Sequence, residues 1–293
     1  MVLPALKLAE KEIKTDYPAF IMGIVNVSGN SFWEGSNAVC RDTDMAVETA
    51  LKMIEEGANI IDIGGETTKP GSQYVSAEEE LERVIPVVKK LRKKTDIPVS
   101  IDTRKAVVMK AALEEGADIL NDVSALEDDA DMVKLAADWK IPVVLMHKRG
   151  IPSEMQKNTA YGNVVEEVAA YLAERAVYAW KAGVEADKII LDYGAGFGKD
   201  VQGNIELVKH GSEIAGKVLE KLNAEGADCK FLHVLAGLSR KSFIGQITGR
   251  ETGERLYGTI AADLFAVQHG ASIIRVHDVA AAKDSLAVYR SVV

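Results

Sequence analysis

The sequence predicts a (β/α)8 barrel, and three observations lead to this fold class. Short apolar runs rich in β-branched residues alternate with longer stretches of helical periodicity. Unbroken apolar runs are typical of parallel strands buried on both faces, with the intervening helices as crossovers. Eight such units predict a sheet that closes into a barrel. The runs cover residues 20–25, 60–63, 99–101, 119–120, 143–146, 189–191, 231–236 and 273–276.

Helix boundaries support this interpretation. The same order of helix end, Gly-Ala pair, strand and polar tip recurs from Gly57, Gly116 and Gly270. A glycine can end a helix in the left-handed conformation that a Cβ atom disfavours. Ser76, followed three residues later by Glu79, forms a capping-box pattern and predicts a helix start.

An open doubly wound sheet is the alternative architecture. It would usually place a glycine-rich phosphate turn after the first strand, but residues 26–30 read Asn-Val-Ser-Gly-Asn. The closed barrel is therefore favoured. The chain has 293 residues without a linker-like stretch, and barrels of about 200–250 residues or more form one unit. We expect one domain over residues 1–293, with the barrel core at about 20–279.

Composition and charge limit the classes of partner. The net charge is -9, and the longest basic run is Arg92-Lys93-Lys94, so a nucleic-acid partner is not expected. The two cysteines, Cys40 and Cys229, lack metal-ligand spacing, which indicates a reducing compartment. Charged residues interrupt the N-terminal apolar stretch, and no apolar run approaches about 18 residues. We expect a cytoplasmic protein without a membrane segment.

Polar residues follow every predicted strand. Barrel enzymes carry their active sites at the carboxyl ends of the strands, so these positions are the candidates for chemistry. For any single position, a helix cap or a loop hydrogen bond is the alternative explanation. The strand-end residues are Asn26, Gly64-Gly65-Glu66, Asp102, Asn121-Asp122, His147, Asp192, Ser239-Arg240-Lys241 and His277-Asp278.

Two groups of strand-end residues indicate a ligand. Asp102, Asn121 and Asp192 would offer carboxylate and amide groups to the polar edge of a flat nitrogen heterocycle, with a metal cage as the competing interpretation. Met146 and Phe197 are candidate apolar walls, or simply core residues.

On the opposite rim, Arg275 and His277 together with Asn26 would form an anion pocket. Three glycines at alternating positions in residues 192–199 would let the backbone approach a ligand closely.

Two connections, residues 26–41 and 64–76, exceed the usual βα loop length of about 2–6 residues. Long loops at a barrel mouth usually cover or complete a site. The first contains Phe32, Trp33 and Glu34, and the second contains Thr67 through Gly71. These loops would supply an aromatic wall and an ion pair, or else they are surface loops without a ligand.

The sequence resembles dihydropteroate synthase over about residues 20–279. The resemblance rests on segments in the family's order and spacing. They are Met-Gly-Ile-Val-Asn-Val at 22–27, Ile-Asp-Ile-Gly-Gly-Glu-Thr-Thr-Lys-Pro-Gly at 61–71, Ser-Ile-Asp-Thr at 100–103, Asn-Asp-Val at 121–123, Met-His at 146–147, Asp-Tyr-Gly-Ala-Gly-Phe-Gly-Lys at 192–199, Ser-Arg-Lys-Ser at 239–242 and Arg-Val-His-Asp at 275–278.

This resemblance implies a transferase of folate biosynthesis that joins 6-hydroxymethyl-7,8-dihydropterin diphosphate to p-aminobenzoate. It further implies Mg2+ as cofactor, with Asn26 as its ligand, a homodimer and a target of sulfonamides. The implied pterin-binding residues are Asp102, Asn121, Met146, Asp192, Gly196, Phe197 and Lys241. The implied diphosphate-binding residues are Asn26, Thr68, Arg275 and His277. The implied p-aminobenzoate-binding residues are Phe32, Thr68, Pro70, Lys241 and Ser242, and the implied catalytic residues are Glu34, Lys69 and Lys241.

The chain departs from the family's usual pattern at five positions. Asn30 and Glu34 replace Asp, Trp33 replaces Ser, Lys69 replaces Arg and Tyr193 replaces Pro. The bulk of Trp33 predicts a narrower p-aminobenzoate pocket.

Three other functions are the alternatives. A methyltetrahydrofolate:corrinoid methyltransferase shares the barrel but does not need the 239–241 and 275–277 segments, and a non-catalytic pterin-binding paralogue would bind without turnover. A Schiff-base aldolase using Lys241 is disfavoured by the polar Ser-Arg-Lys-Ser context, which does not predict a lowered lysine pKa.

Overall fold

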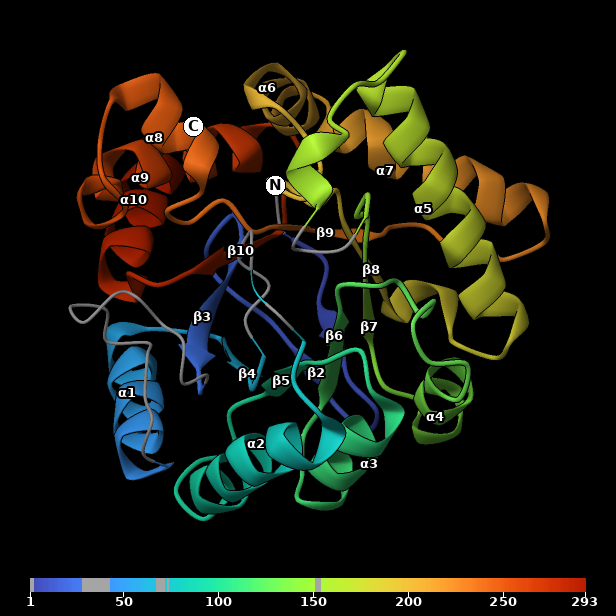
Figure 1. Ribbon diagram of the computed structural model, residues 1–293, viewed down its shortest axis with the longest axis vertical. Helices are drawn as coiled ribbons and strands as arrows, with labels where there is room; N and C mark the ends of the chain where they lie inside the picture. Colours follow the sequence, from blue (N-terminus) through green and yellow to red (C-terminus); the bar gives the residue numbers. More distant parts are fainter. Residues whose placement is uncertain (1–2, 28–42, 67–71, 73, 151–153) are drawn as a thin grey trace.

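The computed structural model describes residues 3–27, 43–66, 72, 74–150 and 154–293. Eight parallel strands form a closed barrel in the order β10-β3-β4-β5-β6-β7-β8-β9, and helices surround it (Figure 1). The barrel strands are β3 (Phe20–Asn26), β4 (Ile60–Gly64), β5 (Val99–Asp102), β6 (Ile119–Asp122), β7 (Val143–Met146), β8 (Ile189–Asp192), β9 (His233–Ala236) and β10 (Ile273–Val276). The predicted (β/α)8 barrel is confirmed.

Within the described residues, the α-helices are α1 (Thr43–Glu56), α2 (Ala77–Arg92), α3 (Ala106–Glu114), α4 (Met132–Trp139), α5 (Val164–Lys181), α6 (Val201–Lys209), α7 (Gly211–Ala224), α8 (Ser242–Thr248), α9 (Leu256–Gln268) and α10 (Val279–Val292). Short 3-10 turns are η1 (Met155–Lys157), η2 (Ala186–Lys188) and η3 (Thr252–Glu254). None of the described helices is both long and apolar enough to cross a lipid bilayer.

The local signals that marked the element boundaries have the expected geometry. Gly57, Gly116 and Gly270 have φ angles of 111°, 98° and 102°, which side chains with a Cβ atom rarely adopt. Ser76 accepts a hydrogen bond from the backbone N–H of Glu79 at 3.1 Å and so caps α2. The observed strand boundaries differ from the predicted ones mainly because five strands continue into the strand-end residues that were expected to follow them.

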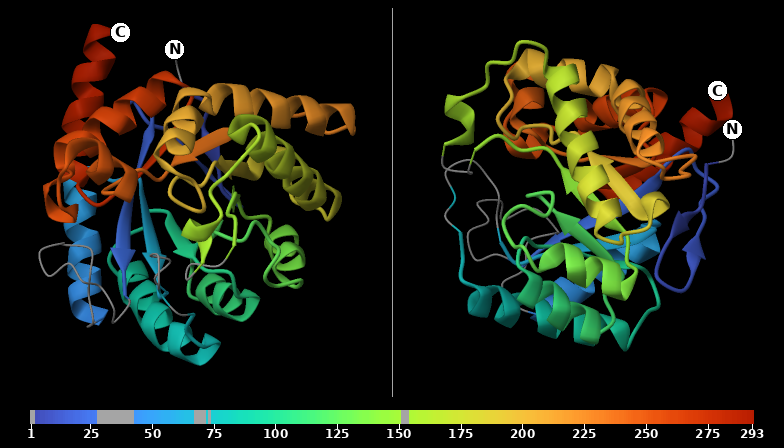
Figure 2. Two further views of the ribbon diagram at one scale, coloured as in Figure 1. Left: turned by 45° about the horizontal axis from the view of Figure 1, so that its top comes forward. Right: turned by 90° about the vertical axis from the view of Figure 1, so that its right-hand side faces the viewer.

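A small antiparallel hairpin near the N-terminus was not predicted. It consists of β1 (Leu6–Lys7) and β2 (Glu12–Ile13) and lies at the end of the barrel where the strands begin (Figure 2). Leu6 and Leu8 pack there against side chains inside the barrel. These interior side chains are Phe20, Met22, Ile60, Ile119, Val144, Ile190, Leu235 and Ile273. The hairpin therefore closes the amino-terminal end of the barrel.

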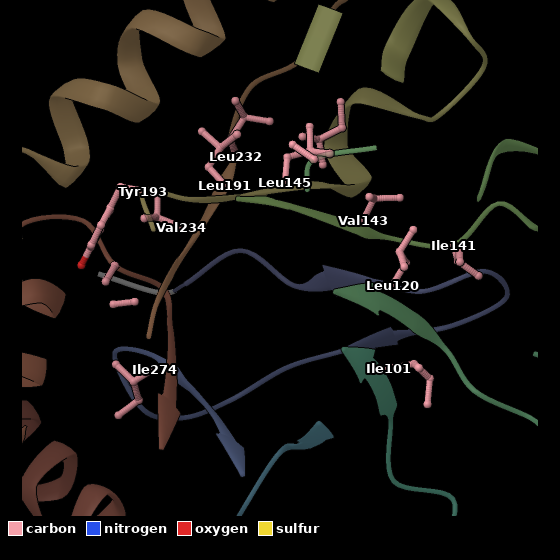
Figure 3. Packing of buried hydrophobic residues seen from close by; sticks show 14 of the residues in the cluster. Ile101, Leu120, Ile141, Val143, Leu145, Leu191, Tyr193, Leu232, Val234 and Ile274 are labelled. Carbon is pink, nitrogen blue, oxygen red and sulfur yellow. The ribbon is translucent and has the colours of Figure 1, made fainter. Parts of the chain in front are cut away.

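Side chains along each strand alternate between the two sides of the barrel wall. Outward residues such as Leu120, Leu191 and Ile274 join the large core between strands and helices (Figure 3). Their inward neighbours Ile119, Ile190 and Ile273 belong to the apolar layer above the hairpin. The next inward position on each strand lies nearer the carboxyl end, where the interior becomes polar.

Candidate active site

The polar inward layer contains several of the predicted site residues. Register places Asn26 beside Gly64, Gly64 beside Asp102 and Asp102 beside Asn121, so these four residues lie at one level. Asp192 pairs in the same way with Met146 on the neighbouring strand. Parallel strands that end at one level bring side chains far apart in the sequence into one site.

Arg275 lies at the centre of this layer. Its Nε atom donates to Asp62 Oδ2 at 2.6 Å, and its Nη2 atom donates to Asp102 Oδ2 at 2.7 Å. Asp62 also accepts from Asn121 Nδ2 at 3.2 and 3.3 Å. The prediction that Arg275 lies on a rim opposite the heterocycle-binding residues is therefore wrong, because its guanidinium reaches across to Asp102.

Asp62 was missed as a site residue. The predicted site residues follow the apolar runs, whereas Asp62 lies inside one and is fully buried. Strand alternation contained the signal, because Asp62 is two residues beyond the inward Ile60 and so faces the barrel interior. A charge at such a position requires a partner, and Arg275 is that partner.

The electrostatics of this cluster follow from burial and mutual attraction. Burial raises the pKa of Asp102 to about 7, an effect that Arg275 opposes and the Asp62 carboxylate increases. Burial disfavours the charged form of Arg275, but Asp62 and Asp102 together hold its pKa above the ordinary value. Arg275 thus supplies the positive charge between two carboxylates of this layer.

Asp192 is oriented by the glycine-rich turn that follows β8. Its Oδ1 atom accepts a hydrogen bond from the Gly194 backbone N–H at 2.7 Å, and burial raises its pKa. Gly194 and Gly196 have φ angles of 67° and 85°, in the left-handed region that favours glycine. A Cβ atom on Gly196 would lie 3.3 Å from Lys241 Cδ, so the turn brings its backbone against the lysine side chain.

Lys241 extends over the apolar wall of the site. Its Nζ atom lies 4.2 Å from the centroid of the Phe197 ring, a cation–π distance. Phe197 packs with Met146, Val123 and Met155 in a separate small apolar cluster. Both predicted wall residues therefore lie together beside Lys241.

Burial lowers the pKa of Lys241 to about 8, while the Asp192 carboxylate opposes this effect. The polar context of Lys241 in the sequence therefore gave the wrong expectation for its pKa, because the surrounding fold partly buries the side chain. Ser242 begins α8 directly after Lys241 and is exposed. It borders a cavity of about 470 Å³ that residues 199–202 and Asn204 also line.

The last two strand ends are joined by their own polar contacts. Ser239 Oγ and His277 Nδ1 are 2.9 Å apart, and the Arg240 guanidinium pairs with the Asp278 carboxylate at 2.8 to 3.2 Å. These contacts couple the segment that carries Lys241 to the segment that carries Arg275.

Residues 22–277 match the model of the family described as pterin binding enzyme. The chain belongs to this family. A dihydropteroate synthase of Haemophilus influenzae is 42% identical over 272 residues, which cover 92% of this chain and 93% of the relative.

Two solved structures extend the comparison. The dihydropteroate synthase of Xanthomonas albilineans with 4-aminobenzoic acid has a TM-score of 0.83 and 42% identity, covering 99% of this chain and 98% of that one. The Burkholderia cenocepacia dihydropteroate synthase complexed with 7,8-dihydropteroate has a TM-score of 0.85 and 37% identity, covering 100% and 97%.

One departure from the usual pterin-binding enzyme pattern can be located. Tyr193, which stands in place of Pro, is almost fully buried and belongs to the outward core between strands and helices (Figure 3). Its ring therefore points away from the inward layer that holds Asp192. The other four departures, Asn30, Trp33, Glu34 and Lys69, lie outside the described residues.

Further predicted site residues lie in the same undescribed segments, namely Phe32, Thr68 and Pro70.

Two strand-end residues of this pterin-binding enzyme have structural partners instead. Asp122 accepts from the backbone N–H groups of Ser124 and Leu126 at 2.7 and 2.9 Å, so the loop explanation holds for it. Glu66 accepts from the backbone N–H of Val75 at 3.0 Å and pairs with Lys105.

Proposed function

We propose that this chain is a dihydropteroate synthase, which condenses 6-hydroxymethyl-7,8-dihydropterin diphosphate with p-aminobenzoate to give 7,8-dihydropteroate and diphosphate. The observation that carries the proposal is the inward polar layer of Asp102, Asn121 and Asp192 at the strand ends, together with Lys241 over the apolar wall of Phe197 and Met146. Family membership and relatives with 4-aminobenzoic acid or 7,8-dihydropteroate bound agree with it. Folate synthesis is the corresponding biosynthetic role.

The pterin ring would lie against Met146, Gly196 and Phe197. A carboxylate at Asp192 accepts the two N–H groups of a guanidine-like edge, and one of its oxygens is already oriented by Gly194. Asp102 and Asn121 would meet the other polar edge of the ring, while Lys241 would donate to its acceptor atoms.

Arg275, His277, Asn26 and Thr68 would bind the diphosphate. Arg275 makes contact with Asp62 and Asp102, so its charge is already oriented before an anionic group arrives. This arrangement would let the guanidinium offset the charge that builds on the leaving group as the bond to the pterin methylene carbon breaks.

Mg2+ is the cofactor implied by the family resemblance, and Asn26 would hold it. A Cβ atom on Gly64 would lie 3.6 Å from Asn26 Oδ1 and 3.4 Å from Asp102 Cβ, so the amide oxygen flanks the inward polar layer. Mg2+ commonly takes one or two protein oxygens and completes its shell with substrate phosphates and water, and a single amide oxygen fits that donor set. When bound, Mg2+ would neutralise negative charge on the diphosphate.

The reaction requires stabilisation of charge more than a strong base. Loss of diphosphate leaves a cation at the pterin methylene carbon, which the Asp192 and Asp102 carboxylates would stabilise. The aniline nitrogen of p-aminobenzoate then attacks that carbon and releases one proton to solvent or to the diphosphate.

The second substrate would lie beside Lys241 and Ser242. Phe32, Thr68 and Pro70 would enclose it, and Glu34 and Lys69 would form the ion pair of the closed loops, which excludes water as a competing nucleophile. Sulfonamides would bind at the same side.

We also propose one domain, a cytoplasmic location and a homodimer. Cys229 is a buried free thiol, in keeping with a reducing compartment. A dimer interface would include the outer face of α9, where Tyr257 and Phe265 are 83% and 40% exposed, next to Val288 on α10 at 64%. The helices α8, α9 and α10 that carry exposed apolar residues lie side by side (Figure 1).

Turnover by the purified protein tests the function. Given the pterin diphosphate, p-aminobenzoate and Mg2+, it should release diphosphate and form dihydropteroate, measured by mass spectrometry. Arg275→Met should abolish turnover, whereas Arg92→Met, which breaks the pair with Asp118 at the amino-terminal ends of the strands, should retain it.

Two outcomes would favour the alternatives. Tight pterin binding without diphosphate release would favour a non-catalytic paralogue. A change in corrinoid absorbance on mixing with a cobalamin protein and methyltetrahydrofolate would favour a methyltransferase.

A further inference from the structure

A buried lysine lies next to the proposed pterin pocket without a carboxylate partner. Lys199 is 2% exposed, and its Nζ atom donates to two backbone carbonyl groups, those of His147 at 2.9 Å and Gly194 at 2.7 Å. Among the ion pairs of the described residues, none includes Lys199. A buried ammonium group is costly, so its retention at this place requires a reason.

The two carbonyl groups belong to the ends of adjacent strands. His147 follows β7, and its backbone N–H donates to the Asp192 carbonyl at 3.0 Å. Gly194 belongs to the turn after β8. Lys199 therefore ties the turn after β8 to the end of β7, on both sides of Asp192.

Gly194 connects Lys199 both to the Asp192 carboxylate and to the Phe197 wall of the proposed pocket. Its N–H donates to the Asp192 side chain, while its carbonyl oxygen accepts from Lys199 and from the Phe197 N–H at 3.1 Å. A Cβ atom at position 194 would come within 1.9 Å of the His147 oxygen, so the turn is packed tightly at this point. The same peptide units thus position the carboxylate and the aromatic wall.

We propose that Lys199 is a positioning residue for the pterin substrate, which holds the Asp192 carboxylate and the Phe197 ring in their binding geometry. The inference rests on the proposed function, because it assigns a role toward that same ligand. Lys199 does not contact the substrate in this role. Burial lowers the pKa of Lys199 well below its ordinary value, and the neighbouring Asp192 carboxylate opposes this effect.

The test compares two buried lysines at opposite ends of β8. Lys199→Met removes the donors while keeping side-chain length. Lys188→Met is the matched control, because Lys188 is 5% exposed and its Nζ atom donates to the Lys140 carbonyl at 2.9 Å at the amino-terminal end of the strand. Calorimetry with the pterin diphosphate gives the dissociation constant, and steady-state kinetics give KM for p-aminobenzoate.

Lys199→Met should weaken pterin binding about 30-fold and leave KM for p-aminobenzoate within about twofold. Lys188→Met should lower the melting temperature and leave both pterin affinity and KM for p-aminobenzoate unchanged. If the role of Lys199 were purely structural, Lys199→Met would give the result expected for Lys188→Met, namely a lower melting temperature with unchanged pterin affinity.

Pterin affinity within threefold of wild type in a folded Lys199→Met protein would overturn the inference. Lys199→Gln, which keeps an NH2 donor group on a shorter side chain and loses the charge, should bind with intermediate affinity and serves if the methionine variant does not fold. A wild-type protein that fails to bind the pterin diphosphate would instead refute the proposed function and leave the geometry of Lys199 unaffected.

Discussion

Replacement of Asp192 by Asn should separate ligand binding from stability. The carboxylate would accept two charge-assisted hydrogen bonds from the pterin edge, whereas the amide accepts one and turns its own N–H groups toward ligand donors. The expected loss is about 2–4 kcal/mol, and at about 1.4 kcal/mol per factor of ten the affinity falls about 30- to 900-fold.

Stability should not fall with it. Burial raises the pKa of Asp192, so the ionised carboxylate is disfavoured in the folded state. Such a group reduces folding stability as the pH rises above its unfolded pKa of about 3.9. At neutral pH, replacement by the uncharged amide removes the destabilisation caused by the buried charge. The amide oxygen can still accept a hydrogen bond from the Gly194 N–H. The unfolding midpoint of Asp192→Asn should therefore equal or exceed that of wild type.

Calorimetry with the pterin diphosphate and thermal unfolding at pH 7 make the comparison. Asp118→Asn is the control, because Asp118 pairs with Arg92 and accepts from the Val99 N–H at 2.9 Å, at the ends of the strands far from the site. The control should keep its affinity for the pterin diphosphate. Wild-type affinity in Asp192→Asn, or an equal loss of affinity in both variants, would refute the assignment.

Four further outcomes are expected. Asp62→Asn should weaken pterin diphosphate binding about 10- to 50-fold in calorimetry, because Arg275 loses one of two carboxylate partners; unchanged affinity would remove Asp62 from the site. Pterin affinity should fall as the pH drops below about 7, the raised pKa of Asp102, and Asp102→Asn should bind weakly at every pH; a flat wild-type profile would contradict this. Asn26→Ala should abolish the effect of a chelator on diphosphate-ligand affinity, and a persisting effect would place Mg2+ elsewhere. Tyr257→Glu should convert a dimer to a monomer in light scattering, and a monomeric wild-type protein would refute the proposed interface.

The barrel could be predicted because its signals are local. Each strand is an unbroken apolar run, and glycines with positive φ end the helices before three of them. The hairpin β1–β2 has no such signal, since each strand has two residues and its stability comes from contacts with the barrel interior. Short elements that depend on tertiary contacts leave little periodicity in the sequence.

The sequence predicted which strand-end residues belong to the candidate site. It did not predict the contacts that these residues make with one another. Strand ends identified Asp102, Asn121 and Asp192, because parallel strands bring their carboxyl ends together. The contact between Arg275 and Asp102 depends on the reach and rotamer of a long side chain across the barrel, which no local pattern encodes. The buried environment of Lys241 is likewise a property of several elements at once.

The hairpin that closes the barrel has a consequence for the order of folding. Some of its partners come late in the chain, since Lys7 pairs with Asp187 and the Ala5 carbonyl lies 3.4 Å from His233 Nε2. The hairpin therefore cannot complete its packing until the second half of the protein has been made. Among the described residues, its partners belong to the apolar layer and the strand beginnings and not to the candidate site, so the hairpin can detach without dissolving that site. Amide hydrogens of residues 6–13 should accordingly exchange with solvent well before those of the barrel strands.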